Sequence, residues 1–378
     1  MVIAIDIRTL LDAKKTGVGE YVYELLTALF QEGPEHTYIL FANQSRKGVI
    51  ALPQHDKKNV HIVYTNIPNK LLHMSIVFFG LPCLDRWLLK KLKGVVDGID
   101  YFFSPNLGFC ALSRGCKQIL TLHDMSFKIY TECLTQKRRL WHTVLRPKAQ
   151  AKRATKIIVP SDTTKRDVAR EFGVSLEKIT TIYPGISSWC LAGVQDFTAV
   201  RNYYALPEKY IFFLGTIEPR KNIIQIIEAY KESQLHKKGY SLLIAGKLGW
   251  KSKKIIEYMQ KTSGVVYLGY IPEEHKKALY TLASVFVYPS MYEGFGFPVV
   301  EAMACGVPVI TSNRSSLPEV VSSSAYLVNP TIRQDLTDAM LRILSSESLR
   351  RYYIQKGKVR AEQYSWSLAA KKFLSLLD

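Results

Sequence analysis

Short apolar segments alternate along the chain with longer stretches in which apolar residues recur every three or four positions. The short segments are rich in β-branched and aromatic residues, which favour strands, and the longer ones have the period of amphipathic helices. Strands that alternate with helices in this way pair in parallel, with helices on both faces of the sheet. The expected strands fall in two series: residues 2–7, 37–42, 61–64, 100–105, 118–124, 156–161 and 179–185, then 210–216, 241–246, 265–269, 284–290, 307–311 and 325–328.

Two domains are expected from the length of the chain and from a break between the two series of strands. The chain has 378 residues, and a typical domain has roughly 150. Residues 184–207 separate the series and carry prolines and glycines with little hydrophobic periodicity. We therefore expect an α/β fold of two doubly wound, Rossmann-like domains, residues 1–190 and 207–365, joined by a linker at residues 191–206. In such folds ligands bind at the carboxyl ends of the parallel strands, so we expect a ligand cleft where the two sheets face each other.

Cysteine usage and hydropathy favour a cytoplasmic protein. The six cysteines are scattered without a C-x-x-C pair, so neither a zinc site nor a disulfide scaffold is expected. The apolar segment at residues 2–7 is too short and too early for a signal peptide. Nothing approaches the roughly 20 apolar residues of a membrane span. We expect a chain that is neither exported nor integral to a membrane.

The net charge of +19 is shared by both halves of the chain and favours acidic partners: nucleic acid, an anionic bilayer or phosphorylated small molecules. Residues 133–161 hold eight basic side chains and no acidic one, on an expected helix kinked near Pro147. Residues 71–94 join an apolar run to several lysines, a composition typical of a segment at a membrane surface. Packing of this run against the domain core, and a basic protein without an acidic partner, stay open as alternatives.

Two glycines follow the first expected strand and precede a helix. Gly17 and Gly19 there allow backbone N–H groups and the helix N-terminus to meet an anion. The pattern is not the dinucleotide-binding fingerprint, because Val22 occupies the third glycine position and the next strand ends in Asn43 without an acidic residue for a ribose. An anion site and a plain tight turn both fit these glycines.

The second domain opens with a similar arrangement. Gly215 follows a strand and allows close approach to the backbone, and Arg220 and Lys221 lie at the start of the next helix. Cations at a helix N-terminus oppose the helix dipole. A bound polyanion would remove this conflict, since arginine forks onto phosphate oxygens and lysine acts as a point charge. The alternative is a pair of solvated side chains.

Two glutamates eight positions apart flank a loop of glycine and phenylalanine. Glu293 begins the segment EGFGFP, and Glu301 lies in the first turns of a helix expected at residues 299–305, after Pro298 and before Gly306. One carboxylate can accept two hydrogen bonds from a vicinal diol such as ribose, and a second can orient a sugar hydroxyl or stabilise positive charge at an anomeric centre. The two are therefore expected to reach different parts of one ligand. A capping role for Glu301 and a surface position for Glu293 stay open.

Several further segments occur in a fixed order along most of the chain: GVGEYVYELLTAL, TLHDMSF, IIVPSDTTKRDV, FLGTIEPRKNI, IAGKLGW, VYPSMYEGFGFPVVEAMACGVPVIT and YSWSLAAKKFLSLL. Together with the spacing of the two glutamates, which matches the E-x7-E signature, this order resembles glycosyltransferase family 4, whose members are retaining enzymes of the GT-B fold. The opening of the chain is also similar to bacterial mannosyltransferases that build surface polysaccharides. Any one segment could arise by chance, but the ordered set is specific.

The resemblance implies a role for each candidate residue. Glu301 would hold the donor ribose, Glu293 would lie beside the donor sugar, and Arg220 and Lys221 would neutralise the diphosphate leaving group. His123, in the segment TLHD, matches the active-site histidine near the donor sugar, whereas a lone histidine at a strand end is otherwise structural. Backbone contacts to the donor would come from Gly17 and Gly19 at the phosphates, from Gly215, from Phe295, Gly296 and Phe297 around the sugar diphosphate, and from Tyr270 and Ile271 at the base.

The same resemblance implies how the domains divide the reaction. The first domain would receive the acceptor, the second would hold the nucleotide, and the last helix, residues 366–378, would cross back onto the first. No Asp-x-Asp metal motif accompanies the diphosphate site, so we expect no metal or other cofactor, with Arg220, Lys221 and helix dipoles stabilising the leaving group. The acceptor hydroxyl would attack from the face that the diphosphate leaves, with retention of configuration. A double displacement with Glu293 as nucleophile is the other route.

GDP-mannose is the first expectation for the donor, and UDP-sugars and other nucleotide-sugars stay open. A saccharide acceptor linked to a lipid would account for the apolar and basic segments, which would dock on an anionic membrane surface, peripherally and on its inner face. The missing fingerprint disfavours a nicotinamide oxidoreductase, and no recognised motif indicates a nucleic-acid partner. A non-catalytic protein that binds nucleotide-sugars is a further alternative.

Overall fold

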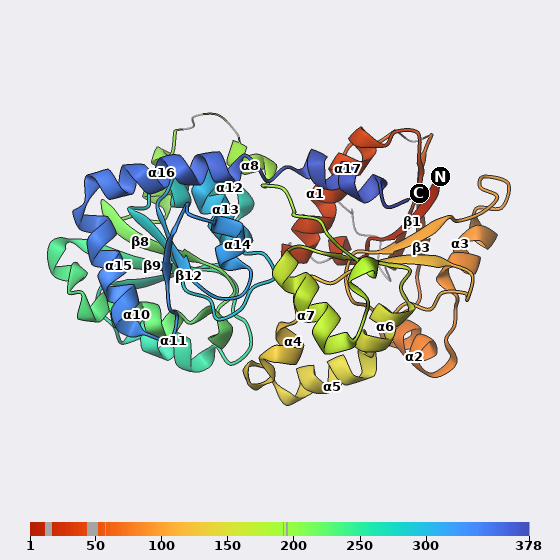
Figure 1. Ribbon diagram of the computed structural model, residues 1–378, viewed down its shortest axis with the longest axis horizontal. Coiled ribbons are helices and arrows are strands. Elements are labelled where there is room, and N and C mark those ends of the chain that lie inside the picture. The colour runs from red at the N-terminus through yellow and green to blue at the C-terminus, as the bar shows by residue number, and fades with distance from the viewer. Residues whose placement is uncertain (12–16, 44–51, 57, 192, 194–195, 378) are drawn as a thin grey trace. The chain divides into compact units, whose positions relative to one another are not determined.

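The computed structural model describes residues 1–11, 17–43, 52–56, 58–191, 193 and 196–377, which form two compact units (Figure 1). The first unit comprises Met1–Met125, Lys137–Gly185 and Ser365–Asp378. The second comprises Ser126–Gln136 and Ile186–Tyr364. Each is built around its own parallel sheet.

The sheet of the first unit has the strand order β3-β2-β1-β4-β5-β6-β7, and every neighbouring pair is parallel. Its strands are β1 (Val2–Asp6), β2 (Thr37–Asn43), β3 (Val60–Thr65), β4 (Tyr101–Ser104), β5 (Lys117–Thr121), β6 (Lys156–Val159) and β7 (Ile179–Thr181). The main helices are α1 (Gly17–Glu32), α2 (Asn69–Phe79), α3 (Leu84–Lys91), α4 (Ser126–Ile129, grouped with the second unit), α5 (Gln136–Leu145), α6 (Pro147–Arg153), α7 (Asp162–Phe172) and α17 (Trp366–Leu374).

The strands at the centre of this sheet are buried on both faces. All residues of β2 after the first are buried, which explains why its sequence is a continuous apolar run and not an alternating one. The last helix, α17, packs against α1, with the ring of Trp366 5.4 Å from that of Tyr21. Phe373 of the same helix meets Phe103 of β4 edge-on, with ring centroids 4.7 Å apart. The last helix is thus part of the core of the first unit.

The second unit has the strand order β10-β9-β8-β11-β12-β13, again parallel throughout. Its strands are β8 (Lys209–Leu214), β9 (Tyr240–Ala245), β10 (Val265–Gly269), β11 (Val285–Tyr288), β12 (Val309–Ser312) and β13 (Tyr326–Val328). Its helices are α8 (Ser188–Leu191), α9 (Thr198–Tyr203), α10 (Ile223–Glu232), α11 (Lys253–Gln260), α12 (Glu273–Thr281), α13 (Phe297–Ala304), α14 (Leu317–Val321), α15 (Arg333–Ser345) and α16 (Glu347–Ala361).

Each sheet has one point at which the strand order reverses. It lies between β1 and β4 in the first unit and between β8 and β11 in the second, because the chain returns to the middle of the sheet after reaching one edge. The crossover helices diverge at such a point and leave space beyond the carboxyl ends of the two strands, where ligands bind in open α/β sheets. The ends of β8 and β11 are therefore the place to look for a site in the second unit.

Every strand expected from the sequence is present, but the structure differs from the sequence prediction in three other places. The basic stretch is broken into α5 and α6 by Arg146, which has a φ of 51°, so it is two helices and not one kinked helix. Within residues 184–207, expected to lack periodicity, α8 and α9 form and pack against α12. The contacts also group Ser126–Gln136 with the second unit, although this segment precedes the expected linker.

Residues 71–94 fold as α2 and α3, and the apolar side chains of the two helices differ in burial. Leu84 and Leu88 of α3 are fully buried in a cluster with Phe41 and Phe102. In contrast, α2 buries only Leu72, and most of its other apolar side chains are exposed. Among the described residues, no helix has the length and apolar character that crossing a bilayer requires.

Candidate active site

The carboxyl ends of β8 and β9 approach each other at a pair of glycines. The Gly215 amide donates to the Ala245 carbonyl at 3.0 Å. A Cβ atom on Gly246, whose φ is +137°, would lie 1.8 Å from the Gly215 carbonyl oxygen. A Cβ on Gly215 itself would lie 3.2 Å from the Phe213 ring and 3.4 Å from the Tyr288 ring. The neighbouring strand therefore lies close to the Gly215 backbone, and the predicted approach of a ligand to Gly215 stays a prediction.

Arg220 and Lys221 follow β8 in the 3-10 helix η4 (Pro219–Lys221), and α10 begins only after Asn222, which has a φ of 60°. The two cations thus precede the helix instead of opening it. They are 9% and 6% exposed, so the alternative of a solvated pair is wrong. The Arg220 carbonyl accepts from the Met291 amide at 2.9 Å, which ties η4 to the loop after β11.

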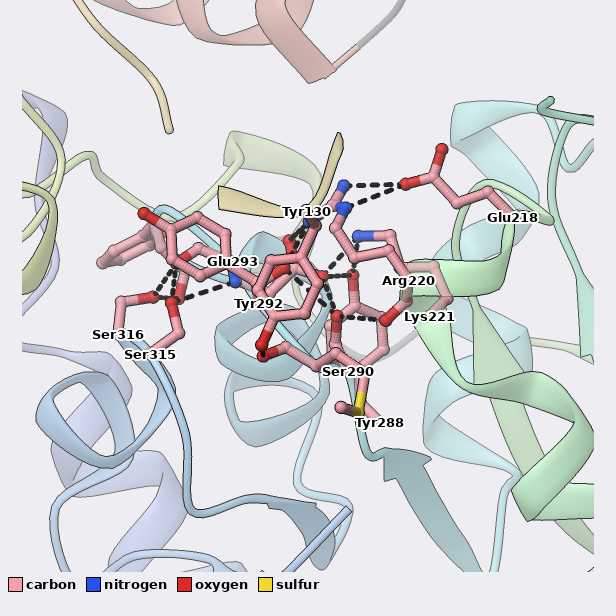
Figure 2. A network of polar contacts seen from close by, with 12 residues as sticks. Tyr130, Glu218, Arg220, Lys221, Tyr288, Ser290, Tyr292, Glu293, Ser315 and Ser316 are labelled. Carbon is pink, nitrogen blue, oxygen red and sulfur yellow. Dashed lines mark hydrogen bonds and ion pairs between the residues drawn. The ribbon is translucent and has the colours of Figure 1, made fainter. Parts of the chain in front are cut away.

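Glu293 lies at the centre of a network of polar contacts (Figure 2). Its Oε1 accepts from Lys221 Nζ at 2.5 Å, from Ser290 Oγ at 2.6 Å and from Tyr288 Oη at 3.0 Å. Its Oε2 lies 3.1 Å from Arg220 Nη1. Lys221 also donates to Tyr288 Oη at 2.6 Å. Both carboxylate oxygens of Glu293 are therefore bound, and the alternative of a surface charge is wrong.

The charges within this network shift the pKa values of its members. Burial alone would raise the pKa of Glu293, but the charges of Arg220 and Lys221 and the hydrogen bonds from Lys221 and Ser290 outweigh it and lower the pKa to about 2. Burial and the Arg220 charge lower the pKa of Lys221, against the opposing effect of Glu293. Glu293 is accordingly an anion at neutral pH.

A second carboxylate, Glu218, orients the Arg220 guanidinium from the other side. Its Oε1 accepts from Arg220 Nε at 3.1 Å and from Nη2 at 2.8 Å, while Nη1 donates to the Tyr292 carbonyl. The two cations and the two carboxylates thus balance in formal charge. No group of three or more His, Cys, Asp or Glu side chains within the described part of the chain could hold a metal ion.

The loop after Glu293 is held by serines that precede α14. The Glu293 amide donates to Ser315 Oγ at 3.1 Å, and its carbonyl accepts from Ser315 at 2.5 Å and from Ser316 at 2.9 Å. Gly296 has a φ of 100° at the N-cap of α13, and a Cβ there would lie 2.7 Å from Leu317 Cδ2. Glycine is needed at this position for both reasons.

The two phenylalanines of the loop have different surroundings. Phe295 is 4% exposed, and its ring packs edge-on against those of Phe297 and Tyr364, with centroids 5.3 and 5.2 Å away. Its carbonyl accepts from Ser316 Oγ at 3.3 Å. Phe297 is half-buried and begins α13, two residues earlier than the sequence predicted for this helix. The loop backbone is thus fixed on both sides of Gly296.

Glu301 lies on α13, is 4% exposed and has a different partner from Glu293. Its Oε2 accepts from Tyr280 Oη of α12 at 2.9 Å. The Tyr280 ring stacks in turn on Trp189 of α8, with centroids 6.1 Å apart and an angle of 10° between the planes. The two glutamates therefore have different protein partners, and this position of Glu301 does not fit a cap at the N-terminus of α13. Whether they reach different parts of one ligand stays a prediction.

The segment after β10 was predicted to face a base. Tyr270 is 38% exposed, whereas the side chain of Ile271 is buried. Lys247, in the loop after β9, places Nζ 5.2 Å from the centroid of the Tyr270 ring. An exposed ring with a cation on one face suits a flat aromatic ligand, since such a ring presents a stacking surface.

His123 follows β5 in the first unit. Its Nε2 lies 2.8 Å from the Pro105 carbonyl oxygen, so this nitrogen carries the hydrogen and Nδ1 is the acceptor. The Tyr21 ring meets the imidazole edge-on at 4.8 Å. Burial lowers the pKa of His123, which favours the neutral ring. The histidine is oriented at the end of β5, next to the end of β4.

Gly17 and Gly19 lie in the first turn of α1 and not before it, because the helix begins at Gly17. Gly17 is exposed, and a Cβ there would meet nothing within 4 Å, while Gly19 is buried. Residues 12–16, directly before this helix, lie outside the described residues.

Sequence reasoning missed several side chains that complete the network. Tyr288 and Ser290 precede Glu293 in the segment VYPSMYE, and Glu218 precedes Arg220 in EPRK, so their proximity along the chain was an available signal. The sequence contains no such signal for Tyr280, because its contact with Glu301 depends on how α12 packs against α13.

The segment Ser126–Gln136 also contributes to this site without any signal in the sequence. Tyr130 donates to the Met291 carbonyl at 3.3 Å, and its ring lies 5.7 Å from that of Tyr292. Lys251, in the loop before α11, donates to the Glu132 carbonyl. The segment therefore packs directly over the loop that carries Glu293.

Two family models match this chain and together span most of it. The family described as Glycosyltransferase Family 4 matches residues 15–188, and the family described as Glycosyl transferases group 1 matches residues 198–360. The second match contains Arg220, Lys221 and both glutamates.

Relatives and a solved structure agree with these matches. O-antigen chain mannosyltransferase B of Escherichia coli is 30% identical over 292 residues, which cover 75% of this chain and 74% of the relative. Serotype-specific mannosyltransferase WbdA of Escherichia coli is 30% identical over 246 residues, 61% of this chain and only 30% of that longer protein. Sucrose-phosphate synthase of Thermosynechococcus elongatus superimposes with a TM-score of 0.76 and 22% identity, over 99% of this chain and 98% of the other. The predicted GT-B fold is confirmed, and the chain belongs to the family 4 glycosyltransferases.

Proposed function

We propose that this glycosyltransferase moves a hexose from a nucleotide-sugar, with GDP-mannose as the first candidate donor, to a saccharide acceptor during synthesis of a cell-surface polysaccharide. One observation supports a nucleotide-sugar above all: two buried cations, Arg220 and Lys221, lie with Glu293 beyond the ends of β8 and β11, where the strand order reverses. Support for mannose and for a surface polysaccharide comes from relatives described as O-antigen chain and serotype-specific mannosyltransferases.

The proposed reaction needs only the substrates and the side chains of the chain. The C1–O bond to the diphosphate breaks, the acceptor oxygen bonds to C1 on the same face, and the acceptor proton passes to an oxygen of the leaving phosphate. Arg220 and Lys221 stabilise the negative charge that develops on the diphosphate, and Glu293 lies beside the positive charge on the sugar. Configuration is retained, and no metal or other cofactor takes part.

Other residues receive their predicted roles within this proposal. Glu301, held by Tyr280, binds the ribose hydroxyls, and the backbone at Tyr270 and Ile271 faces the base. The predicted contacts of Gly215, Phe295, Gly296 and Phe297 with the sugar diphosphate, and those of Gly17, Gly19 and His123 in the first unit, remain predictions.

The test is release of nucleoside diphosphate from a panel of sugar nucleotides, GDP-mannose and UDP-glucose among them, with saccharide and lipid-linked saccharide acceptors. We expect release from one donor, dependent on acceptor and unchanged by a metal chelator, with an α-linked product when the donor is α-linked. Binding without turnover across the acceptor panel would instead favour a non-catalytic sensor. A product of inverted configuration would overturn the same-face mechanism.

The exposed part of the first unit supports a second element of the proposal, peripheral docking on an anionic membrane. Phe109 lies between α2 and α5, with its ring 4.8 Å from His73 and 6.1 Å from Trp141, so the two helices are neighbours. The α2–α5 surface consists of the exposed apolar side chains Leu71, Met74, Phe78 and Phe79 of α2 and Leu140, Trp141 and Val144 of α5, beside the exposed cations Lys137, Arg138 and Arg139.

Apolar side chains next to cations suit an anionic bilayer, because the rings enter the interface while the cations meet the lipid phosphates. Phosphatidylglycerol vesicles should therefore sediment the protein at low salt, and phosphatidylcholine vesicles should not. Replacing both Phe78 and Phe79 by serine should reduce binding to anionic vesicles at least tenfold. Val359, a 56% exposed residue of α16, is the matched control, and Val359→Ser should bind like the unchanged protein. Binding that depends neither on anionic lipid nor on salt would contradict this docking.

A further inference from the structure

Two carboxylates balance the formal charges of the two buried cations, so binding of a diphosphate would leave this site with excess negative charge. Arg220 and Lys221 face Glu218 and Glu293, and all four residues are 9% exposed or less. A diphosphate placed beside the cations adds negative charge that this cluster does not offset. Uncompensated charge in a buried site is costly, and a carboxylate in such a site takes up a proton instead.

The hydrogen bonds show which carboxylate is the better proton acceptor. Glu293 is held as an anion by Lys221, Arg220 and two hydroxyl groups, so protonation would disrupt contacts at both of its oxygens. Glu218 is 1% exposed, and among the described residues its carboxylate accepts hydrogen bonds through Oε1 alone, from Arg220. Its Oε2 is buried and accepts no hydrogen bond from any residue that the structure describes. A proton on Oε2 would break no contact.

We propose, building on the function proposed above, that Glu218 is a positioning residue that takes up a proton when the diphosphate of a nucleotide-sugar binds beside Arg220 and Lys221. The proton resides on Oε2, while Oε1 continues to accept from Arg220 Nε and Nη2. The guanidinium therefore keeps its orientation, and the cluster gains one positive charge toward the leaving group.

The groups that face Glu218 come from three elements. Arg220 and Lys221 belong to η4, Glu293 to the loop after β11, and Cys133 to the 3-10 helix η2 (Thr131–Cys133). Burial raises the pKa of Glu218, the two cations oppose this effect, and Glu293 reinforces it, so that the pKa lies above its usual value of 4.5. A bound diphosphate would raise the pKa further, because it adds a negative charge.

Isothermal titration of the wild-type protein with GDP-mannose and with UDP-glucose tests the proposal without any variant. The diphosphate of either probe does not titrate near neutral pH, so a binding heat that differs between PIPES and imidazole buffers measures proton uptake by the protein. We expect net uptake, and an affinity that falls by up to about tenfold per pH unit between pH 6 and 8.

A variant and a matched control test whether Glu218 is the group that takes up the proton. Glu218→Gln keeps a carbonyl oxygen for Arg220 but cannot titrate, so its proton uptake should vanish and its affinity should change less than about twofold over the same range. Glu228→Gln also removes a carboxylate paired with an arginine, Arg333 at 3.1 Å, but on the surface of α10. The control should take up protons like the wild type.

The outcomes separate this inference from the proposed function. If no sugar nucleotide binds to the wild-type protein, the proposed function fails. If a probe binds without net proton uptake, or if Glu218→Gln takes up as many protons as the wild type, the role of Glu218 is refuted while the donor site stands. Circular dichroism and thermal melting of both variants establish that they are folded.

Discussion

Replacing Glu293 by glutamine should destabilise the protein strongly, and a nucleoside diphosphate should reverse much of the effect. Glutamine has the same shape but no charge, so Lys221 and Arg220 lose the carboxylate that lies 2.5 and 3.1 Å from them. Breaking a buried ion pair by removing one partner costs about 3–5 kcal/mol, since the remaining charge is left uncompensated.

Two figures agree with that range, one from the pKa of Glu293 in the structure and one from the ordinary pKa of a lysine. Lowering the pKa of Glu293 from 4.5 to about 2 corresponds to about 3 kcal/mol of stabilisation by its surroundings. Lys221 can escape an unfavourable site by losing its proton, which at pH 7 costs about 5 kcal/mol for a lysine of ordinary pKa 10.5. The loss in unfolding free energy should therefore lie between these values. For a domain of this size it corresponds to a fall in Tm of about 6–20 °C.

Thermal melting with and without GDP or UDP measures both effects. Because a bound diphosphate would replace the missing carboxylate, the nucleotide should raise the Tm of Glu293→Gln by several degrees more than that of the wild type. Glu228→Gln should melt within about 3 °C of the wild type, since its ion pairs are partly exposed. A Glu293→Gln protein that melts like the wild type would refute the energetic role of the network. Equal nucleotide shifts in both proteins would refute the assignment of the cations to the diphosphate.

Further predictions concern the same site. Replacing Arg220 and Lys221 together by alanine should lower kcat by about 100-fold or more in a nucleotide-release assay, and an unchanged kcat would remove their role toward the leaving group. Tyr280→Phe removes the hydroxyl that donates to Glu301 at 2.9 Å, so the KM for the donor should rise about three- to tenfold with kcat within about twofold; an unaltered KM would argue against Glu301 as a donor contact. The pKa of Glu293 is lower in the folded state than in the unfolded one, so its stabilisation is present above pH 4.5 and is lost as the pH falls toward about 2. In urea titrations over this window the wild type should lose about 3 kcal/mol more than Glu293→Gln, and parallel losses would contradict the low pKa.

The strands could be predicted from the sequence because they are buried on both faces. A run such as β2 has no solvent-facing positions, and its continuous apolar character distinguishes it from the helices on either side. Since parallel strands all end at the same edge of a sheet, this prediction also placed Gly215, the two cations and Glu293 near one another.

The partners of these residues could not be predicted, because they depend on tertiary packing. Tyr280 reaches Glu301 only because α12 packs against α13, and Tyr130 reaches the loop of Glu293 from a segment that precedes it by more than 150 residues. The break at Arg146 likewise needs a left-handed residue for which the sequence offers no glycine. Local secondary-structure propensity therefore does not predict these contacts.

The structure changes the reason for assigning Arg220 and Lys221 to a polyanion, and the assignment itself stays a prediction. Sequence reasoning took Arg220 and Lys221 as helix N-terminal cations whose conflict with the dipole required a polyanion. In the structure they lie in η4, before α10, and two carboxylates already meet their charge. The two cations are unusual because they are buried, and cations in solvent would not need carboxylate partners. In the proposed function a nucleotide-sugar enters a network that is already neutral, and the proton uptake proposed for Glu218 offsets part of the added negative charge.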